Sequence, residues 1–242
     1  MLGVLPSPAP PEEKVLSTKE DFARHGVRLR CRALRYNPYI VKPREGIETV
    51  LRLPEGPRRT AAIAAWFQGL YENEASKPIL VGGAAVELYT GGAYTTGDLD
   101  FVGHVPGKVA RALEESGFRK EGRHWVHSES ETFLELPGSS LEPNEGAARI
   151  VLEGSAVTVI RPEALIVDRL AAWQFWNSVI DGANAFLILR AQRRRLDRRL
   201  VATLAKSRRV EKALDRLLAF ERRHARKEPT REELEQWASH RA

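Results

Sequence analysis

Two acidic residues, Asp98 and Asp100, are separated by a single apolar residue in the segment Asp98–Val102. If this segment is a strand, side chains two apart share a face, so the carboxylates lie side by side while Leu99 and Phe101 face a core. Such carboxylates repel each other unless a cation lies between them, and hard cations such as Mg²⁺ prefer oxygen ligands. The pattern predicts a divalent metal site, although the same spacing also occurs on the solvent face of ordinary edge strands.

A pair of glycines, Gly82 and Gly83, follows the short apolar run Ile79–Val81 and precedes Asp98 by fifteen residues, counted from Gly83. Glycine lets a backbone approach a phosphate closely, and amide groups at the start of a helix can bind one. A glycine pair after a strand is common and by itself indicates little. A phosphate cradle beside a carboxylate pair, however, is the apparatus of phosphoryl or nucleotidyl transfer, and the order and spacing of the two motifs favour that interpretation.

These motifs resemble the nucleotidyltransferase superfamily typified by DNA polymerase β, and within it the minimal bacterial and archaeal members that include abortive-infection and toxin nucleotidyltransferases. The resemblance covers roughly residues 60 to 220 and is carried by the runs Gly83–Leu88, Tyr94–Val102, Ile160–Glu163 and Val167–Trp173. It implies an α/β (α+β) fold, with a nucleotidyltransferase-type mixed sheet flanked by helices and followed by a C-terminal α-helical region. The implied activity is transfer of an NMP unit from an NTP to a hydroxyl, dependent on two Mg²⁺ ions or on Mn²⁺ in their place.

The family places a third carboxylate on a later strand, and Glu135 is the best candidate in this chain. It lies in Thr132–Gly138, which we predict to be a short strand ended by a Pro-Gly turn. A charged residue between two leucines is either an exposed side chain or a ligand, and the resemblance favours the ligand; Glu129 and Glu131 are weaker alternatives. We therefore expect the catalytic and metal-binding residues to be Asp98, Asp100 and Glu135.

The resemblance also implies a set of nucleotide-binding residues: Gly82, Gly83, Thr96 and Arg169. Arg169 has two readings of equal weight, a triphosphate contact or a member of a structural ion pair, and Arg161 is a weaker phosphate candidate. Ala84 follows the glycine pair where many active members carry Ser or Thr, which leaves phosphate binding to backbone amides and Thr96. Ala84 and the long loop before Asp98 support an alternative function, a catalytically inactive nucleotidyltransferase-fold protein that binds nucleic acid or another partner.

The net charge of +6 is unevenly distributed along the 242 residues. Residues 190–228 contain fifteen Lys or Arg and five Asp or Glu, and leucines spaced three and four residues apart predict amphipathic helices with a basic outer face. A solvated helix face accounts for part of this excess, but a large field of one sign attracts polyanions. We expect an RNA partner, such as a tRNA end, bound mainly through phosphates by the densest cluster: Arg193, Arg194, Arg195, Arg198 and Arg199.

Composition limits the remaining function classes. The single cysteine, Cys31, excludes an internal disulfide framework and a Cys-rich zinc site. No apolar stretch has membrane-spanning length and the segment Met1–Pro11 lacks a signal-peptide pattern, so we expect a cytoplasmic protein with no membrane partner. His124 and His127 have no acid or thiol at a metal-binding spacing, which favours ordinary surface histidines over zinc ligands. The expected partners are an NTP, the RNA acceptor and, as the toxin resemblance implies, a cognate antitoxin.

Three regions are expected: 1–57 as an N-terminal extension, partly disordered and of unknown role, 58–161 as the nucleotidyltransferase core, and 162–242 as a basic helical domain. In the extension we predict a helix at Thr18–His25 and strands at Val27–Tyr36 and Ile47–Leu53. In the core we predict helices at Thr60–Tyr71, Ala84–Tyr89 and Gly107–Ser116, and strands at Ile79–Val81, Asp98–Val102, 118–120, His124–His127, Thr132–Leu136, Ala148–Leu152 and Ala156–Ile160. Helices are expected from Pro162 to Ser239.

Three aromatic residues, Trp173, Phe175 and Trp176, lie near the start of the helical region. Either they pack in the core or they form a platform on which bases stack. Because their helix joins the two halves of the chain, we expect them to lie in the core.

Overall fold

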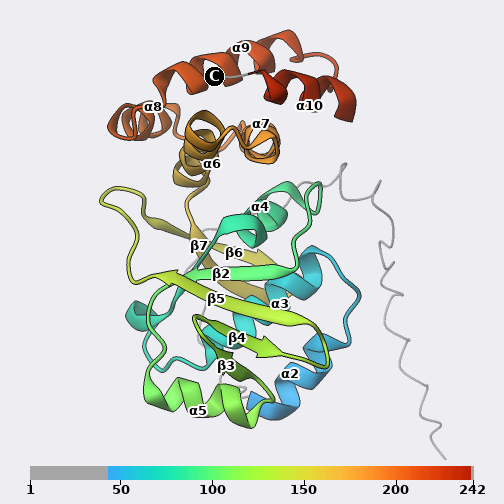
Figure 1. The fold of residues 1–242 in the computed structure, drawn as a ribbon, viewed down its shortest axis with the longest axis vertical. Helices are drawn as coiled ribbons and strands as arrows, with labels where there is room; N and C mark the ends of the chain where they lie inside the picture. The colour runs from blue at the N-terminus through green and yellow to red at the C-terminus, as the bar shows by residue number, and fades with distance from the viewer. Residues whose placement is uncertain (1–42, 241–242) are drawn as a thin grey trace, which may run out of the picture.

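The structure is a computed structural model, and it describes residues 43–240. Seven strands form one mixed sheet in the order β3-β4-β5-β2-β1-β7-β6, with helices beside it and a run of helices after it, so the predicted fold class is confirmed (Figure 1). The strands are β1 (Ile79–Val81), β2 (Asp98–Val102), β3 (Arg119–Glu121), β4 (His124–His127), β5 (Thr132–Gly138), β6 (Ala147–Leu152) and β7 (Ser155–Ile160). The helices are α2 (Pro43–Leu51), α3 (Pro57–Gly69), the 3-10 helix η1 (Glu74–Ser76), α4 (Gly82–Thr90), α5 (Gly107–Glu115), α6 (Pro162–Trp176), α7 (Val179–Gln192), α8 (Arg198–Ser207), α9 (Glu211–Arg223) and α10 (Arg231–Ser239).

The centre of the sheet is built so that the two acidic strands lie side by side. β1 pairs antiparallel with β2 and parallel with β7, and β2 pairs parallel with β5. Because β2 runs opposite to β1, it begins at the edge of the sheet where β1 ends and α4 starts. The glycine turn and the acidic end of β2 are therefore neighbours.

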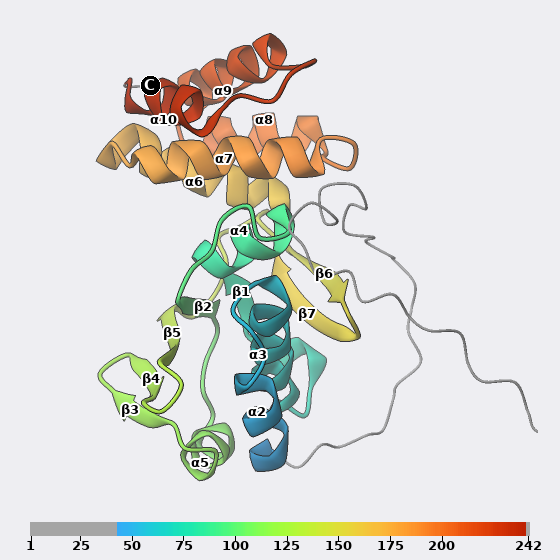
Figure 2. The ribbon, with the colours of Figure 1, turned by 90° about the vertical axis from the view of Figure 1, so that its right-hand side faces the viewer.

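Helices α6 to α10 form a layer at the end of the sheet where α4 lies (Figures 1 and 2). The Tyr89 hydroxyl on α4 donates to the carbonyl of Ile160 at 2.7 Å, and the Gln192 amide on α7 donates to the carbonyl of Tyr89 at 2.8 Å. One cluster of buried apolar side chains runs from Ile47 to Ala238. Within the described chain, no helix combines the length and apolar character needed to cross a membrane.

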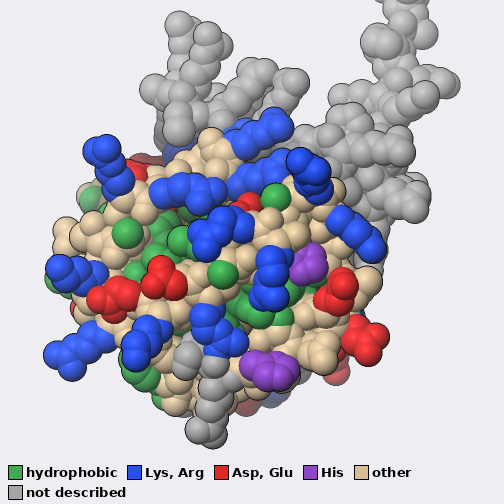
Figure 3. Space-filling view, turned by 90° about the horizontal axis from the view of Figure 1, so that it is seen from above, with side chains coloured by type: hydrophobic (Ala, Val, Ile, Leu, Met, Phe, Trp, Pro, Cys, Tyr) green, Lys and Arg blue, Asp and Glu red, His purple; other side chains and the backbone are tan. Residues whose placement is uncertain are grey.

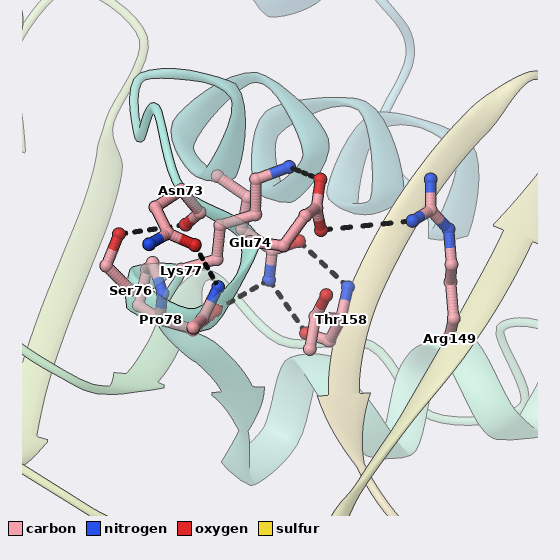
Figure 4. A network of polar contacts seen from close by, with 9 residues as sticks. Asn73, Glu74, Ser76, Lys77, Pro78, Arg149 and Thr158 are labelled. Carbon is pink, nitrogen blue, oxygen red and sulfur yellow. Dashed lines mark hydrogen bonds and ion pairs between the residues drawn. The ribbon is translucent and has the colours of Figure 1, made fainter. Parts of the chain in front are cut away.

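A polar network fixes the start of β1 (Figure 4). The side-chain amide of Gln68, at the end of α3, donates to the carbonyls of Pro78 and Thr158 at 2.8 and 2.7 Å, and its oxygen accepts from the Thr158 amide at 2.8 Å. Asn73 accepts from the amide of Ala75 at 2.9 Å and so caps η1. These contacts join α3, β1 and β7, which sets the position of the glycine pair at the far end of β1.

Two predictions of local structure are wrong. Ile47–Leu53 is not a strand, because α2 occupies Pro43–Leu51. Its apolar residues Ile47, Val50 and Leu51 repeat at three and four residues and pack towards the core, so the segment follows the helical period. β5 does not end at a Pro-Gly turn but includes Gly138, whose carbonyl accepts from the amide of Gly103 at 2.9 Å.

The other core strands and helices lie within a few residues of their predicted bounds, and helices follow Pro162 as expected. Pro162 occupies the first turn of α6, where its missing N–H costs no hydrogen bond. The helix predicted at Thr18–His25 and the strand predicted at Val27–Tyr36 lie outside the described residues.

Candidate active site

The turn from β1 into α4 is shaped around Asp100. Gly82 has a φ of 63°, and a Cβ added there would lie 2.1 Å from Oδ2 of Asp100, so no other residue fits this position. The backbone N–H of Gly83 donates to the Asp100 carboxylate. The glycine pair therefore leaves room for the carboxylate of Asp100 against the backbone of the turn. A phosphate could also approach this backbone closely.

The loop after α4 is held against this turn by a buried acid, Glu87. Its carboxylate accepts from the hydroxyl of Thr60 at 2.9 Å and from the backbone N–H of Thr96. Burial raises the pKa of Glu87, and these two hydrogen bonds oppose the rise. The side chain of Thr96 packs against Gly83, where an added Cβ would lie 3.0 Å from its hydroxyl oxygen. Thr96 thus buttresses the glycine turn and does not line the cleft described below.

The predicted alternation along β2 is confirmed, with Leu99 and Phe101 buried, Asp98 exposed and Asp100 half-buried. In the parallel pairing of β2 with β5, Asp100 lies opposite Glu135. Register partners on neighbouring strands share a face and lie about 5 Å apart. Asp100 and Glu135 are therefore adjacent, whereas Asp98 shares their face but lies at the exposed start of the strand, outside the lining of the cleft.

The environment of Asp100 concentrates negative charge. Burial raises the pKa of its carboxyl, and the charges of Glu135 and Asp98 raise it further. The guanidinium of Arg169 and the amide of Gly83 act in the opposite direction, and the net shift is upward. A carboxylate on which burial and negative neighbours outweigh the positive ones favours a bound cation, which would relieve the repulsion between the carboxylates.

Glu135 has two basic neighbours from the start of β4. The Nε of Arg123 lies 2.7 Å from one carboxylate oxygen, and Nε2 of His124, its register partner, lies 3.1 Å from the other. His124 is therefore more than an ordinary surface histidine, because it contacts a candidate catalytic acid. His127 faces elsewhere, with Nδ1 2.9 Å from the hydroxyl of Ser130.

A cleft of about 390 Å³ opens over the face that carries Asp100 and Glu135. Its opposite wall is formed by the loop between β5 and β6, the first turns of α6 and the end of α8. Gly82 lies in its floor. The charged side chains that line it are Asp100, Arg123, Glu135, Glu142, Glu145, Asp168, Arg169 and Arg208.

Arg169 both forms ion pairs and lines the cleft. It contacts Asp168 at 2.5 Å and Asp181 at 2.7 Å, so the ion-pair interpretation is confirmed. Burial lowers the pKa of Arg169, but the two carboxylates outweigh burial and the net shift is upward. Arg208 lies 3.6 Å from Glu145 and 3.9 Å from Asp168. This bridging arginine was not predicted, because nothing in the sequence relates it to Asp168, forty residues earlier.

Asp100 and Glu135 in the cleft, and Asp98 on the same strand face outside it, offer only carboxylate oxygens, which suits a hard cation. Between residues 43 and 240, however, no three His, Cys, Asp or Glu side chains converge closely enough to hold a metal ion in the conformation described. Glu135 is paired with Arg123 and His124, and Asp100 accepts from Gly83. The residues therefore fit a divalent ion by their donor chemistry and shared sheet face, but to hold one they would have to move closer together, with Glu135 released from its basic partners.

The predicted nucleic-acid residues lie outside the cleft. Arg193, Arg194 and Arg195 follow α7, Arg198 and Arg199 begin α8, and all five, here called the basic turn, are exposed. Figure 3 views the helical layer from above, where Lys and Arg side chains are more prominent than Asp and Glu. Arg161, the weaker phosphate candidate, is exposed beside Gly146, immediately before α6.

The prediction for the aromatic residues of α6 is correct only for Trp173, which is 2% exposed and donates to the carbonyl of Ala238 at 2.7 Å. Phe175 is 55% exposed and Trp176 is 79% exposed, so their assignment to the core is wrong. Phe175 follows Trp173 by about 200° around the helix, which turns it to the opposite side. Trp176 is the last residue of α6 before Asn177, whose left-handed conformation ends the helix.

No protein-family model matches the chain, and neither does any curated protein. The chain is similar to the crystal structure of an antigenic nucleotidyltransferase-like protein from Paracoccidioides brasiliensis, with a TM-score of 0.49 and 15% sequence identity. The match covers 72% of this chain and 93% of that one. Because the TM-score is below 0.5 and the identity is low, the function proposed next is inferred from the residues of this chain.

Proposed function

We propose that this chain is a metal-dependent nucleotidyltransferase that transfers an NMP unit from an NTP to a hydroxyl acceptor. The observation that carries this proposal is the adjacency of Asp100 and Glu135 on parallel strands, over a glycine turn and inside a cleft that also contains arginines. The hydroxyl oxygen would form a bond to the α-phosphorus while the bond to the β-phosphate oxygen breaks, which releases pyrophosphate.

Asp98, Asp100 and Glu135 are the proposed ligands of the divalent ions. Two Mg²⁺ ions, or Mn²⁺ in their place, would activate the attacking hydroxyl and stabilise the leaving pyrophosphate. Asp98 and Asp100 already share a strand face, and Glu135 adjoins Asp100. The raised pKa of Asp100 supports this assignment, because it marks a carboxylate that lacks enough positive charge around it.

The triphosphate is proposed to bind between the glycine turn and the arginines of α6 and α8. Gly82 and Gly83 would offer backbone at the start of α4, and Arg169 and Arg208 would offer guanidinium groups from the opposite wall. Arg169 is held in place by Asp168 and Asp181, so it needs little reordering when an anion enters. Thr96 is proposed to act indirectly, since it supports the turn at Gly83.

An RNA 3′ end, such as that of tRNA, is the proposed acceptor, because the basic turn adds a field that attracts polyanions. A role as a toxin with a cognate antitoxin partner follows from the sequence resemblance alone. The rival function is a catalytically inactive protein of the same fold that binds nucleic acid or a protein partner. Two contacts favour the rival: Glu135 is paired with Arg123 and His124, and Gly83 donates to Asp100.

The decisive experiment incubates the purified chain with Mg²⁺ or Mn²⁺, each labelled NTP and total tRNA, and measures label transfer to RNA, to protein and to small hydroxyl compounds. We expect transfer that falls roughly a hundredfold or more in Asp100→Asn and Glu135→Gln, since even residues that only support metal ligands are worth 10–100-fold. Asp215→Asn removes an exposed acid from α9 and is the matched control, with unchanged transfer.

A second readout does not depend on turnover. Mn²⁺ and an NTP should raise the melting temperature of the wild-type chain and of Asp215→Asn, but not that of Asp100→Asn. Absence of both transfer and metal-dependent NTP binding in the wild-type chain would support the inactive binding protein.

A further inference from the structure

Three exposed apolar residues lie close together in the sequence where α6 turns into α7. Phe175, Trp176 and Ile180 are 55%, 79% and 62% exposed, and they are the large hydrophobic side chains that stand exposed in the part of the chain from 43 to 240. They lie within six consecutive positions, and we call them the aromatic elbow. Scattered apolar residues on a surface are ordinary, whereas a cluster of this kind marks a binding surface.

The aromatic elbow is connected to the cleft in two ways. Asp168 and Arg169 line the cleft, and Phe175 and Trp176 follow them by seven residues, which places them on the same side of α6 roughly 10 Å further along its axis. Ile180 immediately precedes Asp181, whose carboxylate accepts from Arg169 at 2.7 Å. The elbow therefore lies on the side of α6 that faces the cleft, with the buried Ala172 between Asp168 and Phe175, so a strand would have to pass over this covered turn to contact both.

Cationic groups lie beside this path. The side-chain amide of Gln174 donates to the carbonyl of Arg209 at 2.9 Å, which places Arg209 against the residue that precedes Phe175. Arg209 and Lys206 are exposed, and Arg208 lines the cleft itself. Aromatic faces for stacking combined with guanidinium and ammonium groups for phosphates are the means by which proteins bind single-stranded nucleic acid.

We infer that the aromatic elbow stacks unpaired bases of a single-stranded nucleic acid whose 3′ end lies in the cleft. A stacked strand rises about 3.4 Å per base, so roughly 10 Å corresponds to about three nucleotides between the terminal hydroxyl and the elbow. The inference deepens the proposed function and rests on it, because it makes a single-stranded end the acceptor. It also assigns a role to Phe175 and Trp176 that the metal site does not require.

The test measures binding alone, in the Asp100→Asn background, without NTP. The fluorescence anisotropy of a 5′-labelled single-stranded RNA of twelve uridines reports affinity, and the same RNA in a duplex is the comparison. We expect Trp176→Ala and Phe175→Ala each to weaken single-strand binding roughly 5- to 100-fold, since a base stacked on an aromatic ring contributes that much. Trp176→Phe, which keeps a ring, should retain most of the affinity, and duplex RNA should bind more weakly than the single strand.

Intrinsic fluorescence gives an independent readout. Trp125, Trp173 and Trp237 are buried and Trp66 is partly buried, so quenching by bound RNA should come from Trp176 and should disappear in Trp176→Phe. All variants should keep the melting temperature of the parent because the altered side chains are exposed.

Unchanged RNA affinity in both alanine variants would overturn the inference, as would a change only in self-association seen by sedimentation. The proposed function can fail independently of this inference. If the wild-type chain transfers no label but Trp176→Ala still weakens RNA binding, the enzymatic activity is rejected and the elbow remains a nucleic-acid-binding surface.

Discussion

Glu135 is the residue whose present contacts matter most for the chemistry. It lies beside Asp100 but pairs with Arg123 at 2.7 Å and His124 at 3.1 Å, so a cation must compete with these partners. The side chain of Arg123 is 69% exposed, and exposed ion pairs contribute little net energy. Arg123 can therefore leave Glu135 at small cost, and its pairing is a weak obstacle to metal binding.

Arg123→Ala should tighten Mn²⁺ binding by about 1.4- to 5-fold, because it removes a competitor worth about 0.2–1 kcal/mol from Glu135. Electron paramagnetic resonance of free Mn²⁺, or calorimetry, measures this affinity without any turnover. Arg119→Ala is the matched control, since this arginine contacts Ser128, which follows β4, and does not pair with Glu135. Equal or weaker Mn²⁺ binding by Arg123→Ala would mean that Glu135 is not a metal ligand.

At the scale of elements, α4 joins the sheet, the loop before β2 and the helical layer. Its first residue admits Asp100, its Glu87 holds Thr60 and Thr96, and its Tyr89 contacts both Ile160 and Gln192. Glu87 is 1% exposed, so its carboxylate is desolvated when ionised. Ionised Glu87 therefore destabilises the folded protein through lost hydration, while its hydrogen bonds position the glycine turn.

Glu87→Gln should stabilise the protein at neutral pH by roughly 0.5–2 kcal/mol while it keeps an oxygen for Thr60 and Thr96. Burial raises the pKa of Glu87 above 4.5 in the folded protein. The contribution of protonated Glu87 to the free energy of unfolding is therefore fully present below pH 4.5, and it is lost as pH rises through the folded-state pKa. The advantage of Glu87→Gln should therefore be absent below pH 4.5 and grow as pH rises to neutrality. Urea denaturation across this pH range measures it.

Glu87→Ala provides the contrast, because it leaves Thr60 and the Thr96 amide without their acceptor and should be less stable than Glu87→Gln by about 1–3 kcal/mol at every pH. A Glu87→Gln variant less stable than the wild type at pH 7 would show that the ionised carboxylate stabilises α4, contrary to this account.

The local elements explain which parts of the site could be predicted from the sequence. Asp98–Val102 carries its own strand signal, so the alternation of its side chains follows from period alone. The segment around Ile47 is short enough to fit both the two-residue period of a strand and the 3.6-residue period of a helix. Only its packing against the core distinguishes the two, and it favours the helix. The exposure of Phe175 could have been inferred from its angle to Trp173, whereas the position of Trp176 depends on where α6 ends.

Contacts between distant segments are the part that could not be derived from residues alone. The adjacency of Asp100 and Glu135 depends on β5 inserting beside β2 in parallel register, and only the family resemblance pointed to Glu135. The partners of Glu135 follow once the β4–β5 hairpin register is known. Arg208 enters the cleft through the packing of α8 against α6, for which the sequence contains no local signal.

At the scale of the whole molecule, the helical layer presents two different surfaces. The aromatic elbow lies at the start of α7, and the basic turn follows its end, roughly 20 Å away along the helix. Asp197 orders the basic turn by accepting from the amides of Arg199 and Leu200 at 2.9 and 3.1 Å. If a single strand stacks at the elbow, the body of the same RNA can reach the basic turn, where contacts would be to phosphates and independent of sequence.

Replacement of Arg193, Arg194, Arg198 and Arg199 by Gln should therefore weaken RNA binding uniformly across sequences and flatten its salt dependence. Each lost phosphate contact lowers the slope of log affinity against log salt by about 0.7 for a single strand, so four contacts would lower it by up to about 3.

The control removes the same amount of charge at the opposite end of the molecule, near α2, α5 and β3 (Figure 1). Its four substituted residues are Arg52, Lys108, Arg111 and Lys120. Anisotropy titrations between 50 and 200 mM salt separate the two sets. An equal change in slope for both sets would mean that the basic turn affects RNA binding only through the net charge of the protein. A change confined to the first set would assign the phosphate contacts to the basic turn.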